Sequence, residues 1–224
     1  MNKIPVIAID GPSASGKGTV AQRVAAKLGF HYLDSGALYR LVAFAAMRSG
    51  VDLRDEVALS GVAAHLNVVF EGAEIRLDNE NVTDAIRTEE CGNSASRIAA
   101  YPQVRTALLV RQRAFCRLPG LVADGRDMGS VVFPEASLKI FLTASAETRA
   151  QRRYNQLMEK GMDANIATLL QDIRDRDARD SNRSVAPLQL GAGTQLLDTT
   201  SLDITQAVDH VLELYAEISA KERA

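Results

Sequence analysis

One stretch decides how this chain can be interpreted: Gly11-Pro12-Ser13-Ala14-Ser15-Gly16-Lys17-Gly18-Thr19. It follows a short apolar run, opens a helical pattern and fits the frame G-x-x-x-x-G-K. Glycines let backbone N–H groups turn inward onto an anion, while the helix N-terminus and Lys17 add positive charge. All nine residues are therefore expected to form a phosphate-binding loop (P-loop). The alternative is a plain glycine-rich turn in which Lys17 faces solvent. The flanking predicted strand and helix favour the P-loop over this alternative.

The loop departs from the general pattern at Gly18, where many P-loops carry the Ser or Thr that ligates magnesium. The ending Lys17-Gly18-Thr19 resembles the nucleoside monophosphate kinases. That resemblance implies Mg²⁺ held largely by phosphates and water, with no strong protein ligand. Asp124, which follows an apolar run, is a candidate supporting carboxylate, although an Asp that caps a turn explains it equally well.

Apolar runs alternate with helical patterns along the chain. Near-continuous hydrophobicity is typical of strands in a parallel sheet that is covered on both faces. The predicted strands span residues 4–9, 31–33, 121–123, 138–143 and 195–197. The predicted helices span residues 18–28, 37–49, 104–116, 146–160, 165–179 and 204–220. This alternation predicts a doubly wound α/β fold, a P-loop NTPase core with a five-stranded parallel sheet and helices on both faces.

One region breaks the alternation. Two short apolar runs, residues 66–70 and 73–77, flank Glu71-Gly72 and predict a β-hairpin. A small β-containing insertion is therefore expected at about residues 60–90. The rest of the chain, residues 1–224, is expected to form one folding unit around it.

Arginines recur at helical spacing from residue 149 to residue 183. Arg149, Arg152 and Arg153 are predicted to share one helix face, and Arg176, Asp180 and Arg183 another. A solvated helix with internal ion pairs is the plain interpretation. Phosphoryl transfer, however, accumulates charge that guanidinium groups stabilise. The segment is therefore expected to be a helical lid, with Gly161 ending its first helix and Asp163 starting its second.

Two polar segments follow predicted strands at the edge where α/β proteins bind ligands. They are Asp34-Ser35-Gly36-Ala37-Leu38-Tyr39-Arg40 and Asp124-Gly125-Arg126-Asp127-Met128-Gly129. A carboxylate and a guanidinium together can satisfy the hydrogen-bonding edge of cytosine. A helix cap in the first segment and a surface ion pair in the second are the alternatives.

These motifs, together with Arg176-Asp177, Arg179-Asp180 and Asn182-Arg183, resemble bacterial cytidylate kinases over nearly the whole chain. The resemblance implies transfer of phosphate from ATP to CMP or dCMP. It also implies a nucleoside monophosphate-binding insertion at about residues 35–105 and a lid at about residues 149–183. Lys17, Arg149, Arg153 and Arg176 would be catalytic. Acceptor contacts carried over from the family are Ser35, Tyr39, Arg40 and Arg105 for the monophosphate, Ser96, Arg126 and Asp127 for cytosine, and Arg176, Asp180 and Arg183 for phosphate and sugar.

Composition limits the classes of partner. Lys and Arg number 26 against 28 Asp and Glu, so no global field favours nucleic acid or an anionic membrane. Cys91 and Cys116 suggest no disulfide framework, and the N-terminus shows no secretion signal, so a cytoplasmic location is expected. A monomer is expected as well.

Three other functions compete with this hypothesis. Another P-loop kinase, acting on a different monophosphate or on an alcohol, is the nearest. A nucleotide-dependent switch should carry an Asn-Lys-x-Asp guanine-binding motif, which has no suitable place here. A binder of single-stranded RNA should carry more aromatic residues than the 5% found here.

Overall fold

The computed structural model describes residues 4–71 and 74–223, which fall into two compact units. The first comprises Met1–Leu33 and Phe115–Ala224, and the second Asp34–Ala114. The monophosphate-binding insertion expected at about residues 35–105 lies within the second unit. Its role as an insertion that binds nucleotide stays a prediction.

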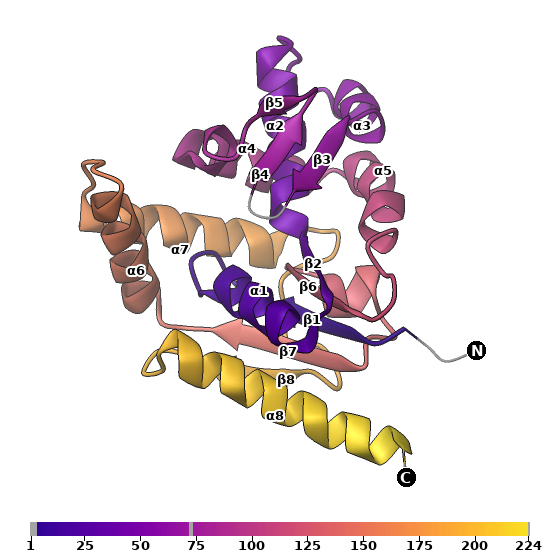
Figure 1. Cartoon of the computed structure of the whole chain (residues 1–224). Helices are drawn as coiled ribbons and strands as arrows, with labels where there is room; N and C mark the ends of the chain where they lie inside the picture. Colours follow the sequence, from indigo (N-terminus) through magenta and orange to yellow (C-terminus); the bar gives the residue numbers. More distant parts are fainter. Residues whose placement is uncertain (1–3, 72–73, 224) are drawn as a thin grey trace. The chain divides into compact units, whose positions relative to one another are not determined.

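A five-stranded sheet forms the centre of the first unit (Figure 1). Its order is β2-β6-β1-β7-β8, with β1 parallel to β6 and β7, and β7 parallel to β8. The strands are β1 (Val6–Asp10), β2 (His31–Asp34), β6 (Leu121–Gly125), β7 (Leu138–Thr143) and β8 (Gln195–Asp198). Every residue of β1 and β6 is buried, as expected where helices flank a parallel sheet. All five predicted strands are confirmed.

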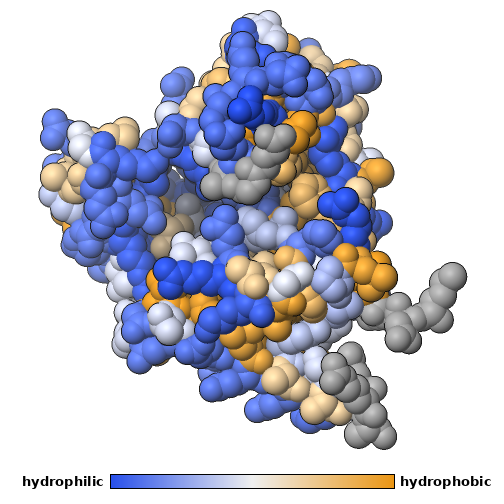
Figure 2. Space-filling view, in the orientation of Figure 1, coloured by the Kyte–Doolittle hydropathy of each residue, from blue (hydrophilic) through white to orange (hydrophobic). Residues whose placement is uncertain are grey.

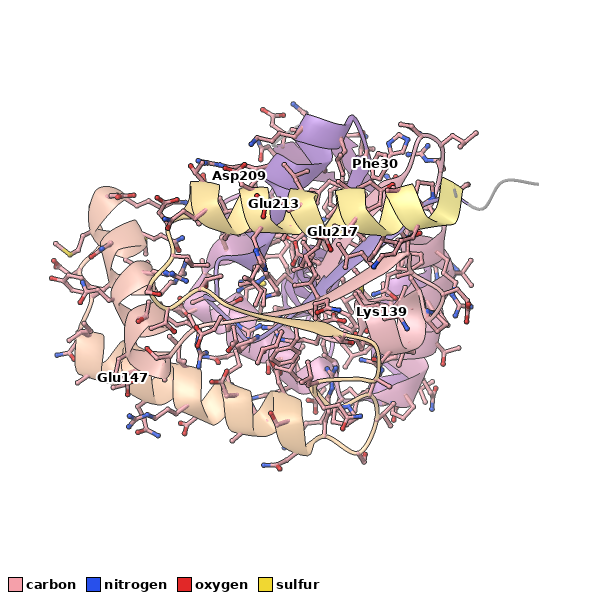
Figure 3. All side chains as sticks on the ribbon, turned by 90° about the horizontal axis from the view of Figure 1, so that it is seen from below. Phe30, Lys139, Glu147, Asp209, Glu213 and Glu217 are labelled. Carbon is pink, nitrogen blue, oxygen red and sulfur yellow. The ribbon has the colours of Figure 1, made fainter. Side chains whose placement is uncertain are left out.

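Four α-helices belong to this unit: α1 (Lys17–Leu28), α6 (Ala146–Glu159), α7 (Ile166–Asn182) and α8 (Ile204–Arg223). A short π-helical segment, η2 (Met128–Val132), follows β6. The core joins apolar residues of α1 and α8 to those of β1, β7 and β8. Figure 3 shows α8 with Asp209, Glu213 and Glu217 along it, and Asp209 accepts a 2.8 Å hydrogen bond from Lys27.

The two helices predicted for the lid segment, residues 146–160 and 165–179, are confirmed, while the role of this segment as a lid stays a prediction. Gly161 follows the C-cap of α6 with a φ of 70°, a conformation that favours glycine. The N-cap of α7 is Asn165, whose side chain accepts hydrogen bonds from the backbone of Ala167 and Thr168. The prediction that Asp163 starts this helix was therefore wrong, because the two backbone donors are within reach of Asn165.

The second unit combines four α-helices with a small sheet. The helices are α2 (Ser35–Arg48), α3 (Glu56–Ala64), α4 (Glu89–Ile98) and α5 (Pro102–Arg113), with a 3₁₀ turn, η1 (Ala85–Arg87). The sheet pairs β3 (Val68–Glu71), β4 (Glu74–Leu77) and β5 (Glu80–Asn81) in antiparallel order. The predicted hairpin is thus confirmed, while Gly72 and Ala73 lie outside the described residues.

The sequence prediction missed α3 and α4. Both begin at side-chain caps, because Asp55 accepts from the backbone of Ala58 and Thr88 accepts from that of Cys91. Such caps are a recognisable start signal for short helices.

The surface in the view of Figure 2 is mostly hydrophilic, including the part over α6. Among residues 4–71 and 74–223, no helix combines the length and the apolar character that crossing a bilayer requires.

Gly11→Ala tests whether the P-loop depends on the close approach of Gly11 to the backbone of Leu142 in β7. A Cβ at Gly11 would lie 2.0 Å from the backbone oxygen of Leu142, so either the loop or β7 must shift. We expect a loss of about 2–3 kcal/mol of unfolding free energy, measured by urea denaturation. Gly61→Ala in α3 is the matched control, because a Cβ there meets nothing within 4 Å. It should stabilise by roughly 0.5–1 kcal/mol, and equal effects of the two changes would contradict the close approach.

Candidate active site

The P-loop joins β1 to α1 and holds its lysine close to the loop itself. Gly16 caps α1 with a φ of 91°, and Lys17 is the first residue of the helix. The Lys17 side chain is buried, and its Nζ donates to the backbone oxygen of Pro12 at 3.2 Å. Ser15 Oγ is buried and has no hydrogen-bond partner among the described residues. A buried hydroxyl, a helix N-terminus and an ammonium in one loop fit the binding of phosphate oxygens.

Two arginines of α6 bind carbonyl groups of the same loop. Arg149 Nη1 donates to the backbone oxygen of Ser13 at 3.2 Å, and Arg152 Nη1 donates to that of Ser15 at 3.0 Å. Arg152 also donates to the side chain and the backbone of Thr199, at 3.1 and 2.6 Å. The predicted arginine face of α6 therefore lies against the P-loop, and Arg152 is tied more extensively than the sequence suggested.

Arg149 has a second partner, which sequence analysis did not assign. Its two terminal nitrogens donate to the two carboxylate oxygens of Asp177 in α7, at 3.1 and 2.6 Å. The third residue of the predicted face, Arg153, is partly exposed and lies 3.4 Å from Gln156 Oε1. Bidentate pairing fixes the guanidinium plane of Arg149, so α6 and α7 are held together at the residue that touches the P-loop.

Asp124 is buried at the end of β6, beside the first turn of α1. Tyr32 of β2 donates its hydroxyl to Asp124 Oδ2 at 2.6 Å. A Cβ placed on Gly18 would lie 3.6 Å from both oxygens of this pair, which is ordinary van der Waals contact. The carboxylate predicted as the supporting acid thus lies next to the position where other P-loops carry a hydroxyl. Sequence analysis missed Tyr32, since nothing local marks it.

Asp10, also missed, is the buried carboxylate at the end of β1. It accepts hydrogen bonds from the backbone of Met128 at 2.8 Å and of Gly129 at 2.9 Å. Burial raises the pKa of Asp10 from its ordinary value of 3.8 to about 6. The two amide bonds act against this rise, and the charge of Asp127 adds to it.

Arg126 and the late arginines surround another buried carboxylate. Arg126 Nε donates to Asp180 Oδ2 at 2.7 Å, and both side chains are largely buried. Burial acts to raise the pKa of Asp180, but the charges of Arg126, Arg176 and Arg183 outweigh it and hold that pKa below its ordinary value. Asp180 is therefore ionised at neutral pH, and the structure brings together four residues that the sequence placed in two separate motifs. Asp127, next to Arg126, is buried as well.

The remaining predicted site residues lie in the second unit. Ser35 Oγ accepts from Gln112 Nε2 at 2.9 Å, and Arg105 Nη1 donates to the backbone oxygen of Ala99 at 3.2 Å. Tyr39 and Ser96 are buried. Gln112 was not expected from the sequence, and it fixes the direction of the Ser35 hydroxyl.

Arg40 of α2 is anchored by the turn before α4. Its Nη1 donates to the backbone oxygens of Ile86 at 2.7 Å and Thr88 at 3.1 Å. Burial lowers the pKa of Arg40. A Cβ on Gly92 would lie 2.7 Å from Arg40 Nη2, so the absence of a side chain at Gly92 makes room for the guanidinium.

The predicted site residues thus form two sets. One set in the first unit gathers the P-loop, the arginines of α6 and α7, and the segment after β6. The other set, in the second unit, is Ser35, Tyr39, Arg40, Ser96 and Arg105. The first set combines a phosphate-binding loop with guanidinium groups. Such groups can bind a polyphosphate and neutralise the charge that develops when a phosphoryl group is transferred.

Known proteins agree with this chemistry. The family model described as cytidylate kinase matches residues 7–217. A protein named cytidylate kinase from Nitrosomonas eutropha is 59% identical over 219 residues, covering 98% of each chain. Another of that name, from Chromobacterium violaceum, is 60% identical over 217 residues, covering 97% of this chain and 98% of its own.

A solved structure of a gluconokinase from Sinorhizobium meliloti 1021 is similar in fold. Its TM-score is 0.52 at 15% identity, covering 100% of this chain and 98% of that one. At this identity the likeness supports the P-loop kinase fold alone.

Asp10→Asn should change how stability depends on pH. Because the pKa of Asp10 is raised by folding, its contribution to stability is full below about pH 3.8 and is lost as pH rises through about 6. The unfolding free energy of the wild type, minus that of the variant, should fall by roughly 2–2.5 kcal/mol between pH 4 and 7. Urea denaturation at several pH values measures this difference. Parallel stability curves for the wild type and Asp10→Asn would refute the buried charge.

Proposed function

The chain belongs to the cytidylate kinase family, and from this membership we propose that it transfers the γ-phosphate of ATP to CMP or dCMP. The products are ADP with CDP or dCDP, in pyrimidine nucleotide metabolism. The observation that carries the proposal is the P-loop held by Arg149 and Arg152, together with Arg126 and the buried Asp127 at the adjacent strand end. Donor binding and recognition of a polar base edge are both provided in this unit.

The donor side is assigned to the P-loop. Backbone N–H groups of the P-loop, residues 11–19 except Pro12, would bind the ATP phosphates. Lys17 would reach the β- and γ-phosphates in place of its bond to Pro12. Arg149, Arg153 and Arg176 would stabilise the charge that develops as phosphate is transferred. Support comes from the contact of Arg149 with the loop and from the charge of Arg176 near Asp180.

The acceptor side is assigned to three groups of residues. Ser35, Tyr39, Arg40 and Arg105 would bind the monophosphate. Ser96, Arg126 and Asp127 would bind cytosine, because a carboxylate accepts from its amino group and a guanidinium donates to its ring acceptors. Arg176, Asp180 and Arg183 would contact the phosphate and sugar, with Asp180 holding Arg126 in position.

No general base is required for this reaction. A monophosphate is already an oxyanion at neutral pH, so catalysis consists of positioning and charge neutralisation. Mg²⁺, when bound, would neutralise charge on the donor phosphates. The residues near it would be Thr19, at the exposed start of α1, and Asp124, whose carboxylate is held by Tyr32. The ion itself would be held mainly by phosphates and water.

We further propose that α6 and α7 act as a lid that excludes water during transfer, which would limit hydrolysis of ATP. The enzyme would work as a cytoplasmic monomer on free nucleotides. The near balance of 26 basic and 28 acidic residues supports this view, because it gives no general attraction to nucleic acid or to membranes.

A panel of acceptors tests the proposal directly. ADP release with purified protein should be fastest with CMP and dCMP, and much slower with UMP, AMP, GMP, shikimate and gluconate. A clear preference for an acceptor without cytosine would overturn the assignment. Tight ATP binding with negligible CMP-dependent turnover would instead favour a nucleotide switch.

Lys17→Ala and Asp127→Ala separate the two sides of the site. Lys17→Ala should lower kcat by roughly a hundredfold or more with every acceptor, because charge on the transferred phosphate loses its nearest ammonium. Asp127→Ala should reduce the ratio of kcat/KM for CMP to that for UMP by roughly 10–100-fold, while kcat changes less. Steady-state kinetics with both acceptors measure the ratio. An unchanged ratio in Asp127→Ala would remove Asp127 from base recognition.

A further inference from the structure

Asp10 is a buried carboxylate to which the proposed reaction assigns no role. It ends β1, the central strand, in register with Gly125 of β6. Its two oxygens accept from the backbone of Met128 and Gly129, the first two residues of η2. Asp10 therefore reaches from one strand end to the segment that follows the neighbouring strand end.

The segment that Asp10 holds directly follows Asp127. Asp127 is the N-cap residue of η2, and aspartate at that position usually accepts a hydrogen bond from the backbone that follows. Within the described chain, the Asp127 side chain makes no such capping bond. Asp10 makes the bonds to these amides instead, so the carboxylate of Asp127 is not used as the cap of its own helix.

Two hydrogen bonds to adjacent amides constrain the turn after Asp127 more tightly than a single hydrogen bond would. Oδ1 binds the amide of Met128 and Oδ2 that of Gly129, so both the position and the rotation of this turn are set. On its other side, Gly129 faces the aliphatic chain of Lys139, labelled in Figure 3, because a Cβ on Gly129 would lie 3.2 Å from Lys139 Cγ. The turn after Asp127 thus lies between the carboxylate of Asp10, which accepts its two hydrogen bonds, and the side chain of Lys139.

The neighbour of Asp127 is held in a matching way. Arg126 donates to Asp180, a carboxylate from α7. The adjacent pair Arg126 and Asp127 therefore depends on two distant carboxylates. Asp180 orients the guanidinium side chain directly, and Asp10 orients the backbone that carries the second member.

Keeping Asp10 charged opposes folding. Burial raises the pKa of Asp10 to about 6, so ionisation of this carboxyl group is less favourable in the folded protein than in the unfolded chain. Asparagine, of nearly the same shape, would avoid the buried charge but could accept from only one of the two amides. A charge retained at this cost, in contact with a predicted recognition segment, points to a role beyond packing.

We propose that Asp10 is a positioning residue for acceptor selectivity, which holds the turn after β6 so that the carboxylate of Asp127 faces the amino group of a cytosine base. Asp10 touches neither the base nor the phosphates. It acts through the amides of Met128 and Gly129. The inference rests on the proposed function, because it concerns discrimination between cytosine and uracil.

Asp10→Asn is the decisive variant. The ratio of kcat/KM for CMP to that for UMP should fall at least roughly tenfold, while KM for ATP stays within about twofold of the wild type. A residue that only supports the fold would lower both acceptor activities equally and leave the ratio unchanged. Asp55→Asn, the same chemical change at an exposed helix cap outside the site, should leave ratio and rates unaltered.

The double variant Asp10→Asn with Asp127→Ala tests whether Asp10 acts through Asp127. If it does, adding Asp10→Asn to Asp127→Ala should reduce the ratio no further. Independent multiplication of the two losses would overturn the inference.

A direct measurement keeps the inference testable should the variant lose activity through misfolding. Hydrogen exchange at the amides of Met128 and Gly129 should accelerate at least roughly tenfold in Asp10→Asn, while amides of α8 keep their wild-type rates. Unchanged exchange at residues 128 and 129, or exchange that accelerates throughout the protein, would overturn the inference. The wild-type ratio separates the two hypotheses: no preference for CMP defeats the proposed function, whereas a preference that survives in Asp10→Asn defeats only the role of Asp10.

Discussion

Buried charge is stable in this chain only where another group compensates it, and the carboxyl ends of β1 and β6 depend on that constraint. Asp10 ends β1, and Asp124 is the last residue but one of the neighbouring strand β6. Asp10 is compensated by the amides of the turn after β6, and Asp124 by the hydroxyl of Tyr32. Each compensating bond crosses between segments, so the same interaction that makes a charge tolerable also positions a loop.

In the P-loop, too, polar groups are paired with groups from distant segments, but here the loop supplies the acceptors and the distant segments supply the donors. Its N–H groups are expected to face the phosphates, and its carbonyl oxygens at Ser13 and Ser15 need donors of their own. Arg149 and Arg152 supply them from α6, and Asp177 fixes Arg149 from α7. The helices that would close over the nucleotide therefore also complete the hydrogen bonding of the loop. A movement of these helices would be felt by the loop through the same guanidinium groups.

Local features of this fold were predictable because they depend on neighbours in sequence. The apolar runs gave all five strands of the sheet, and the glycines at 11 and 16 gave the turn into α1. Helix ends were less certain, as Asn165 rather than Asp163 begins α7. Both are acceptable cap residues, and only the path of the backbone decides which one reaches the donors. The helices α3 and α4 escaped prediction although each begins at a side-chain cap, Asp55 and Thr88, that was available as a local start signal.

The sequence by itself determined the sheet, the phosphate-binding loop and the residue types available for binding nucleotides. Only the tertiary structure decided which carboxylate serves which purpose. Asp10 and Met128 are 118 positions apart, Tyr32 and Asp124 are 92 apart, and no periodicity relates the members of either pair. Their pairing follows from the strand order β2-β6-β1, which makes these three strands neighbours in the sheet. Patterns in a sequence report local conformation, whereas a hydrogen bond between distant segments exists only after the chain has folded.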